Sequence, residues 1–205
     1  MIATSYIRYY ARSIAIVSLA ALLALSACGD REARGDYPAA NGNNCLPEVS
    51  LIDQHGSSVS LASLKGKPVL IDFIYTSCAS TCPMLTAKMA AIARQLGPAL
   101  GADVRIVSIT LDPEHDGPAQ LAAYAKSQAV ESNSWLFLTG KPADIDQVLA
   151  AFKLRRMRES DGSIMHSVSA FLLGPDGHQI RQYNALDVSA KTVAADIDRL
   201  ATASK

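Results

Sequence analysis

The sequence predicts an α/β fold with a mixed central sheet that is flanked by helices. Short apolar runs rich in β-branched residues alternate with segments whose apolar residues recur every three to four positions. Two further apolar runs around the turn Gly174-Pro175-Asp176-Gly177 predict a hairpin, and a helical segment follows it. Alternating strands and helices followed by a hairpin and a helix are typical of an α/β sandwich.

Strands are expected where apolar residues cluster between turn-forming residues. The first two flank the turn Gln54-His55-Gly56-Ser57, and the run from Val69 to Tyr75 is apolar enough for a strand buried on both faces. The expected strands lie at residues 51–52, 59–61, 69–75, 104–111, 135–138, 167–173 and 179–183. The segment from Lys153 to Ser163 is expected to be an excursion between the helix expected to begin at Pro142 and the strand 167–173.

Helices are expected in four segments. The first follows the loop after residue 75, buries Leu85, Met89, Ile92 and Leu96 on one face, and ends at Gly97-Pro98. The other three are expected to begin near Pro118, at Pro142 and after Ser189, because proline suits a first helical turn and serine caps one. The thioredoxin fold has this order of strands and helices.

The N-terminus has the features of a bacterial lipoprotein signal. Arg8 and Arg12 precede an uncharged run from Ser13 to Ala27, which is too short for a comfortable membrane span. The run ends in Leu25-Ser26-Ala27-Cys28, which resembles a lipobox, in which the cysteine receives lipid and becomes the mature N-terminus. A plain secretory signal is the alternative. Both interpretations place the protein outside the cytoplasm, and the first anchors it on the periplasmic side of a bacterial cell envelope.

The chain is therefore divided into three parts. Residues 1–27 are the predicted signal peptide, the polar and turn-rich residues 28–45 are a flexible tether, and residues 46–205 form one thioredoxin-like domain. The chain has 19 basic and 19 acidic residues. Such a balance gives no basic surface for nucleic acid, so a nucleic-acid partner is not expected.

The chemistry concentrates in the loop that contains Cys78 and Cys82. This loop follows a buried strand and leads into a helix, which is the usual place for ligands in an open α/β sheet. If the segment is helical, cysteines four apart share a face with Cβ atoms about 5–6 Å apart, close enough to bind one metal ion or to form a disulfide. The helix N-terminus should lower the pKa of the thiols. An inert structural disulfide is the alternative, although it would close a very short loop.

A site with two thiolates needs a further donor, and His166 is the favoured histidine. It precedes the strand 167–173, whose start packs beside the cysteine loop in a thioredoxin-type sheet. His55 and His178 lie in turns, whereas His115 lies in a loop that could approach the site. Imidazole together with thiolates is a suitable donor set for copper.

At this point the sequence resembles the SCO/SenC family, which are thioredoxin-like assembly factors for the binuclear copper site of cytochrome c oxidase. The resemblance rests on blocks that keep the family's order over most of residues 46–200: Asp72-Phe73-Ile74-Tyr75-Thr76-Ser77-Cys78 with Cys82-Pro83, Ser108-Ile109-Thr110-Leu111-Asp112-Pro113, Trp135-Leu136-Phe137-Leu138-Thr139-Gly140, His166-Ser167, and Phe171-Leu172-Leu173-Gly174-Pro175-Asp176-Gly177.

The resemblance implies that Cys78, Cys82 and His166 are copper ligands and that Cys78 and Cys82 are also a redox pair. It implies a copper-binding metallochaperone or thiol-redox assembly factor rather than an enzyme, with thiol-disulfide reductase activity open. The implied partners are the copper-bearing subunit of cytochrome c oxidase or other copper-handling proteins. Asp112 matches an acidic residue near the family's site, although Asp-Pro is also a common turn composition.

Several alternatives remain open from the residues. A general extracytoplasmic thiol-disulfide oxidoreductase usually has Cys-x-x-Cys and a proline facing it, whereas this chain has Cys-x-x-x-Cys and no proline in residues 166–169. A peroxidase would need a Pro-x-x-x-Thr-x-x-Cys pattern, which does not occur around Cys78 or Cys82. Met165 could be a soft extra ligand, but a packing role is favoured. Cys45 could be a free thiol or the partner of another cysteine.

Overall fold

One mixed sheet of seven strands organises the part of the chain that the computed structural model describes, residues 45–203. The strand order is β2-β1-β5-β4-β3-β8-β9. The predicted signal peptide, Cys28 and the tether up to residue 44 lie outside the described residues. Along residues 45–203, no helix combines the length and the apolar character that crossing a bilayer requires.

Parallel strands form the centre of the sheet, and antiparallel strands extend it on both sides. The parallel strands are β3 (Val69–Ile74), β4 (Arg105–Thr110) and β5 (Trp135–Thr139). The antiparallel ones are β1 (Ser50–Asp53), β2 (Ser58–Ser60), β8 (Ser169–Leu173) and β9 (Gln179–Asn184). The mixed sheet expected from the sequence is thus confirmed, with strand bounds that differ from the expected ones by one or two residues.

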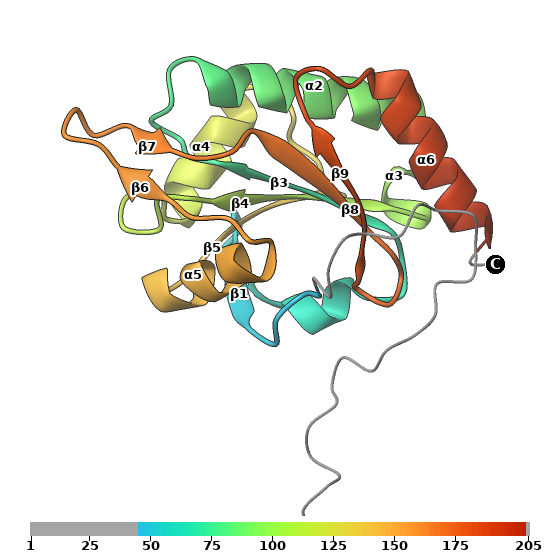
Figure 1. Ribbon diagram of the computed structural model, residues 1–205, viewed down its shortest axis with the longest axis horizontal. Helices are drawn as coiled ribbons and strands as arrows, with labels where there is room; N and C mark the ends of the chain where they lie inside the picture. The colour runs from blue at the N-terminus through green and yellow to red at the C-terminus, as the bar shows by residue number, and fades with distance from the viewer. Residues whose placement is uncertain (1–44, 204–205) are drawn as a thin grey trace, which may run out of the picture. The chain divides into compact units, whose positions relative to one another are not determined.

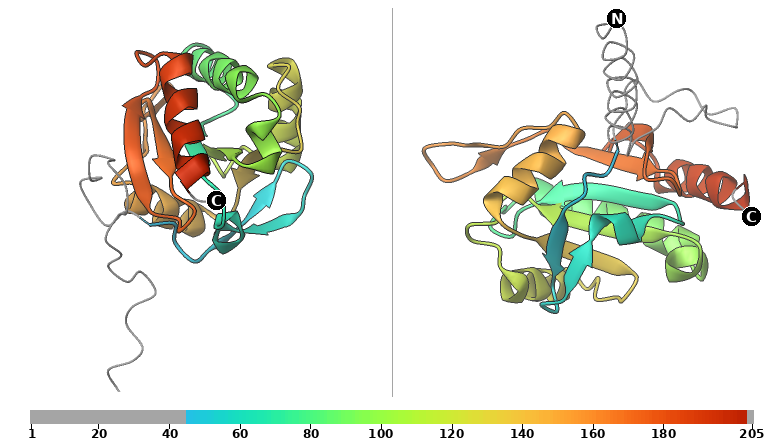
Figure 2. Two further views of the ribbon diagram at one scale, coloured as in Figure 1. Left: turned by 90° about the vertical axis from the view of Figure 1, so that its right-hand side faces the viewer. Right: turned by 90° about the horizontal axis from the view of Figure 1, so that it is seen from below.

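Helices cover both faces of the sheet (Figure 1). They are the 3-10 helix η1 (Leu61–Leu64) and the α-helices α2 (Thr81–Leu96), α3 (Ala99–Ala102), α4 (Pro118–Ser127), α5 (Pro142–Ala151) and α6 (Ala190–Ala203). Helices α2, α4 and α6 lie on one face and α5 and η1 on the other, and Figure 2 shows α2 and α6 side by side. Pro118 and Pro142 begin their helices, and Ser189 accepts a hydrogen bond from the Thr192 amide at the start of α6, as the sequence predicts.

Burial on both faces explains the composition of β3. All six of its residues are buried, because helices cover both sides of the sheet there. On the α5 face, Phe73 packs edge-on against Phe171 and Phe152, with ring centroids 6.0 and 5.5 Å apart. On the opposite face, Trp135 stacks on Phe137 with centroids 5.5 Å apart. The site loop therefore leaves a strand that is held in the middle of the core.

The expected excursion at residues 153–163 contains regular structure. Part of it forms a separate two-stranded hairpin from β6 (Met157–Arg158) and β7 (Ile164–Met165). The hairpin extends beyond the main sheet in Figure 1. Strands of two residues are too short to show a period in the sequence, so no pattern indicated them. Because β7 runs directly into His166, this hairpin determines the approach to β8.

Candidate metal and thiol-redox site

Cys78 and Cys82 lie together at the N-terminus of α2. Cys78 is in the loop before the helix and Cys82 is in its first turn, so the segment between them is not the helix that a shared helical face would require. Instead, the Cys78 Sγ atom accepts a hydrogen bond from the Cys82 backbone amide, with 3.3 Å between the two atoms. Both thiols are free, and their residues are 9% and 0% exposed. Cys78 thus occupies the place of a capping side chain at the helix start.

The two thiols have opposite pKa shifts. Burial alone would raise the pKa of Cys78, but hydrogen bonds from the amides of Cys82 and Ser80, the Cys82 thiol and the Tyr75 hydroxyl outweigh it and lower the pKa. Burial raises the pKa of Cys82, and the charges of Cys78 and Asp72 raise it further. The predicted lowering by the helix N-terminus is therefore found for Cys78 and is wrong for Cys82, because Cys82 is inaccessible to water.

Tyr75 connects the cysteine loop to His166. Its hydroxyl hydrogen-bonds Cys78 and accepts a hydrogen bond from the Ile164 amide at 3.4 Å. Its ring packs edge-on against the His166 imidazole, with centroids 6.1 Å apart. In the sequence Tyr75 is visible only as part of a motif, because its partners Ile164 and His166 lie 89 or more positions away in the chain.

His166 is held in a form that can donate to a metal. Its Nδ1 atom donates to the Ser167 carbonyl oxygen, with 3.0 Å between the atoms. That tautomer leaves the Nε2 lone pair available. Burial lowers the pKa of His166 even though the Ser167 carbonyl acts in the opposite direction, so the neutral imidazole is favoured. Neutral imidazole is the form that binds metal ions.

The structure brings together two of the three predicted metal ligands. Cys78 and Cys82 are in direct contact, whereas His166 is related to them through Tyr75. In the described range 45–203, no three side chains of His, Cys, Asp or Glu are grouped closely enough to hold a metal ion. A three-ligand copper site at these residues therefore stays a prediction.

Asp116 fixes the start of the cysteine loop, a role that the sequence pattern does not indicate. This carboxylate is buried and accepts hydrogen bonds from the Thr76 amide at 3.0 Å, the Thr76 hydroxyl at 2.5 Å and the Thr110 hydroxyl at 2.6 Å. It joins the end of β4 to the loop after β3 through charge-assisted hydrogen bonds. Its position in a run of turn residues gave no sequence signal that it would be buried.

Asp112, which matches an acidic residue near the family's site, binds the β6–β7 hairpin. Its Oδ1 atom accepts a hydrogen bond from Arg158 at 2.5 Å and lies 2.8 Å from His115 Nδ1. His115 is largely exposed. No hydrogen bond of Asp112 to Cys78 or His166 occurs among the described contacts. Asp112 therefore contacts the segment that carries His166 rather than the predicted ligands.

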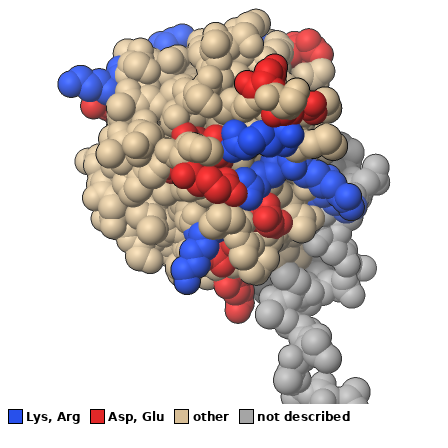
Figure 3. All heavy atoms as spheres, turned by 90° about the vertical axis from the view of Figure 1, so that its left-hand side faces the viewer, with Lys and Arg blue, Asp and Glu red and all other residues tan. Residues whose placement is uncertain are grey.

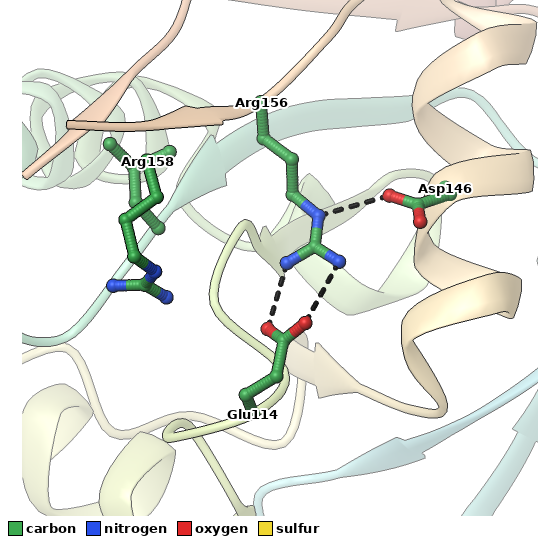
Figure 4. A pocket seen from close by; sticks show the side chains of 5 residues that line it. Glu114, Asp146, Arg156 and Arg158 are labelled. Atoms are coloured by element: carbon green, nitrogen blue, oxygen red, sulfur yellow. Dashed lines mark hydrogen bonds and ion pairs between the residues drawn. The ribbon is translucent and has the colours of Figure 1, made fainter.

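Arg156 binds the base of the β6–β7 hairpin to the loop that contains Glu114 and to α5. It forms a bidentate pair with Glu114 at 2.8 and 3.1 Å and bonds Asp146 of α5 at 2.9 Å (Figure 4). It also donates to the Leu111 carbonyl oxygen at 3.1 Å. Figure 3 shows basic and acidic side chains interleaved on this side of the molecule. Planar bidentate pairs are geometrically specific, so the base of the hairpin has a defined position.

A buried carboxylic acid lies below the site, on the face of the sheet that α2 covers. The Oδ1 atom of Asp72 accepts a hydrogen bond from Ser108 at 2.5 Å, and Ser108 in turn accepts one from the Trp135 indole at 2.9 Å. Its Oδ2 atom is buried without a partner among the described residues. Burial raises the pKa of Asp72 to about 7, although the Ser108 hydrogen bond opposes the rise.

The remaining sequence candidates lie apart from this cluster. His55 is an exposed residue whose amide donates to Asp53 in the first turn. His178 lies in the β8–β9 turn, where its amide donates to Asp176. The sequence leaves undecided whether Cys45 is a free thiol or is bonded to another cysteine, and in the structure it is disulfide-bonded. Among the histidines of residues 45–203, His166 is favoured because its ring packs against Tyr75, whose hydroxyl hydrogen-bonds Cys78.

Comparison with known proteins gives matches over most of the chain. The family model described as SCO1/SenC matches residues 38–202. A Bacillus subtilis protein named SCO1 protein homolog is 36% identical over 168 residues, which cover 80% of this chain and 84% of that protein.

Solved structures match as well. A structure described as a SCO1/SenC family lipoprotein from Bacillus anthracis has a TM-score of 0.71 at 28% identity, covering 77% of this chain and 96% of that one. Bradyrhizobium japonicum ScoI with copper bound has a TM-score of 0.64 at 32% identity, covering 74% and 96%. BsSco, described as having a disulfide switch and as a member of the Sco family of cytochrome c oxidase assembly proteins, has a TM-score of 0.69 at 33% identity, covering 77% and 94%.

Proposed function

Because the chain belongs to the SCO1/SenC family, we propose that it binds copper and serves as a metallochaperone and thiol-redox factor in assembling the binuclear copper site of cytochrome c oxidase. The observation that carries this proposal is the contact between Cys78 and the start of α2, which favours a thiolate next to a second thiol. Copper bound to a ScoI structure and the oxidase-assembly role stated for BsSco support it.

The proposed copper ligands are Cys78, Cys82 and His166. Thiolates are soft donors that suit copper(I), and imidazole completes a donor set that copper accepts. The Cys78 thiolate and the free Nε2 of His166 fit this role, while Cys82 must lose its proton when the ion binds. Ligation by all three side chains requires His166 to turn towards the thiols, since Tyr75 occupies the contact between them.

The same two thiols can reduce a disulfide in a partner protein. The Cys78 thiolate attacks one sulfur of the partner's disulfide, forming a mixed disulfide and releasing the other sulfur as a thiolate, which takes up a proton. Cys82 then loses its proton and attacks Cys78 Sγ. The products are a Cys78–Cys82 disulfide and a partner with two thiols, so two electrons have moved to the partner. A thiol of lowered pKa that keeps 9% of its surface exposed suits the attacking role, and a fully buried thiol of raised pKa suits the second role.

We propose a location outside the cytoplasm, with a lipid anchor at Cys28 on the periplasmic side of the cell envelope. The short apolar run and the Leu25-Ser26-Ala27-Cys28 sequence support it. The lipoprotein description of the Bacillus anthracis structure supports it as well. The partner is the copper-bearing subunit of the oxidase or another copper-handling protein, whose exposed thiols could take the ion from Cys78 and Cys82.

Anaerobic titration of the reduced protein with copper(I), followed by dialysis and metal analysis, tests the proposal. The wild type should retain one copper ion, and Cys78→Ala and Cys82→Ala should lose it, whereas His115→Ala should behave as the wild type. Undiminished copper in both cysteine variants would refute the proposal. A general extracytoplasmic thiol-disulfide oxidoreductase would instead reduce an unrelated protein disulfide as fast as the oxidised cysteine pair of an oxidase copper domain.

A further inference from the structure

Exposed methionines are unusually frequent near the site. Among residues 45–203, four large apolar side chains are exposed, and three of them are Met84, Met157 and Met165, with exposures of 60%, 61% and 61%. Met89 is fully buried in the core. A single exposed apolar residue is ordinary, but a contiguous exposed pair calls for an explanation. The packing role favoured for Met165 from the sequence is therefore wrong, because most of its surface contacts water.

Met157 and Met165 form such a pair. They are directly opposite each other in the β6–β7 hairpin, and Arg158 is opposite Ile164. Directly opposed residues of an antiparallel pair have Cβ atoms about 4.5–5.5 Å apart and point to the same face. Successive residues alternate in direction, so the methionines lie on the face opposite to Ile164, which is buried, and Arg158, which reaches Asp112.

The hairpin that carries the pair has a defined conformation. At its tip the Glu159 amide donates to the Ser163 carbonyl oxygen at 2.8 Å, and Gly162 has a φ of 85°, which glycine adopts without strain. At its base Arg156 and Arg158 bind acidic residues of the neighbouring loop and of α5. The backbone therefore places Met157 and Met165 opposite each other, and both side chains are exposed to solvent.

The chemistry of two adjacent thioethers is specific. Thioether sulfur is a soft, polarizable donor that selects copper(I) over hard cations, and methionine has three rotatable bonds with which to adjust its reach. A thioether has no proton to lose and forms no disulfide, so its affinity does not depend on the redox state of Cys78 and Cys82. Met165 is also the chain neighbour of His166, which contacts Tyr75 beside Cys78.

We propose that Met157 and Met165 form a second, weaker binding site for a soft monovalent metal ion, copper(I), on the solvent face of the β6–β7 hairpin. This inference rests on the proposed copper function, in which the pair is the place where the ion arrives before it passes to His166 and the thiols. Two neutral donors hold the ion less firmly than thiolates do, so transfer towards Cys78 and Cys82 is downhill.

Titration with silver(I), a redox-inert soft monovalent ion, tests the pair apart from the thiols. Cys78 and Cys82 are first oxidised to a disulfide, and the methionine methyl groups are followed by NMR in protein labelled with 13C-methyl methionine. The Met157 and Met165 signals should shift together and saturate. Met157→Leu and Met165→Leu keep the size and apolar character of the side chain, and each should weaken silver binding at least about tenfold. Met84→Leu, which removes an equally exposed thioether, should leave it unchanged.

Two outcomes would overturn the inference. Equal, non-saturating shifts of Met84, Met157 and Met165 would mean that silver meets exposed thioethers individually. The absence of any shift at millimolar silver would leave the pair as an apolar surface for a protein partner. The copper titration of Cys78→Ala and Cys82→Ala reports on the thiol site alone. A failure of the proposed function in that experiment is therefore distinguishable from a failure of the methionine pair to bind silver. Reduced protein with Met165→Leu should take up copper(I) more slowly and retain the same amount at equilibrium.

Discussion

The ring of Tyr75 packs edge-on against the imidazole of His166 while its hydroxyl hydrogen-bonds the Cys78 thiol. One side chain thereby contacts two of the three proposed copper ligands, which are 88 positions apart in the sequence. Its hydroxyl also accepts a hydrogen bond from the Ile164 amide, so the ring is held from the hairpin side as well. Tyr75 is positioned to influence both the acidity of Cys78 and the approach of His166.

Removing the Tyr75 hydroxyl should make the Cys78 thiol less acidic. In metal-free protein, Tyr75→Phe is expected to slow alkylation of Cys78 at pH 7 by up to about tenfold, the factor that corresponds to loss of ~1.4 kcal/mol of thiolate stabilisation. The rate is measured against pH by mass spectrometry. Tyr124→Phe is the matched control, because the Tyr124 hydroxyl bonds Thr86. Identical pH profiles for wild type and Tyr75→Phe would show that the hydroxyl does not stabilise the thiolate.

His166 should matter for copper and little for the disulfide. His166→Ala removes the proposed imidazole ligand, so copper(I) affinity should fall at least about tenfold, whereas Cys78 and Cys82 should still form a disulfide under mild oxidant. Competition with a chromophoric copper(I) chelator measures the affinity, and thiol counting measures the oxidation. His178→Ala, which changes a turn histidine, serves as the control. Wild-type affinity in His166→Ala would remove this residue from the ligand set.

Copper binding should depend on the redox state of the cysteine pair. Oxidation of Cys78 and Cys82 removes two proposed donors, so only the dithiol form should bind copper(I) firmly. By mass action, copper(I) should then stabilise the dithiol and raise its midpoint potential. The potential is measured in a fixed thiol buffer with and without copper(I). An unchanged potential, together with equal copper binding by the oxidised protein, would place the metal elsewhere.

Asp72 should make the folded protein less stable as the pH rises. Its pKa is about 7 in the folded state and near the ordinary 3.8 when unfolded, so the folded state binds more protons between these values. The stabilisation is complete below pH 4 and is lost as the pH passes 7, by at most roughly 4 kcal/mol. Asp72→Asn cannot ionise and should abolish this loss. Urea unfolding of the wild type and of Asp72→Asn from pH 5 to pH 9 measures this loss. Parallel plots of the unfolding free energy against pH for the two proteins would contradict the prediction.

Cys28 should be the site of lipid attachment. Cys28→Ala should abolish incorporation of labelled fatty acid and either release the domain from membranes or leave an unprocessed precursor, as the lipobox-like sequence predicts. The intact mass of the wild-type protein from membranes should include the lipid. Undiminished labelling of the variant would refute the prediction. A lipid thioether and a disulfide use the same Sγ atom, so lipidation of Cys28 requires the disulfide of Cys45 to have a different partner.

The sequence alone determined the order of strands and helices and the place of the cysteine loop. These features are local: the apolar run of β3, the period of α2 and the prolines that begin α4 and α5 are each visible within a short window. The motifs around Cys78, Cys82 and His166 sufficed to indicate the SCO/SenC family. The β6–β7 hairpin had no such signal, because two residues per strand are too few for a period.

The tertiary structure decided the electrostatics and the contacts of the site. Cys78 and Cys82 are alike in the sequence, but burial raises the pKa of one while helix amides and the Tyr75 hydroxyl lower that of the other. Asp112 and Asp116 are both acids of one turn, yet the first binds Arg158 and the second holds Thr76, which is 40 positions away. Such differences arise from solvent exclusion and from partners distant in the chain, and neither quantity is encoded in a local pattern of residues.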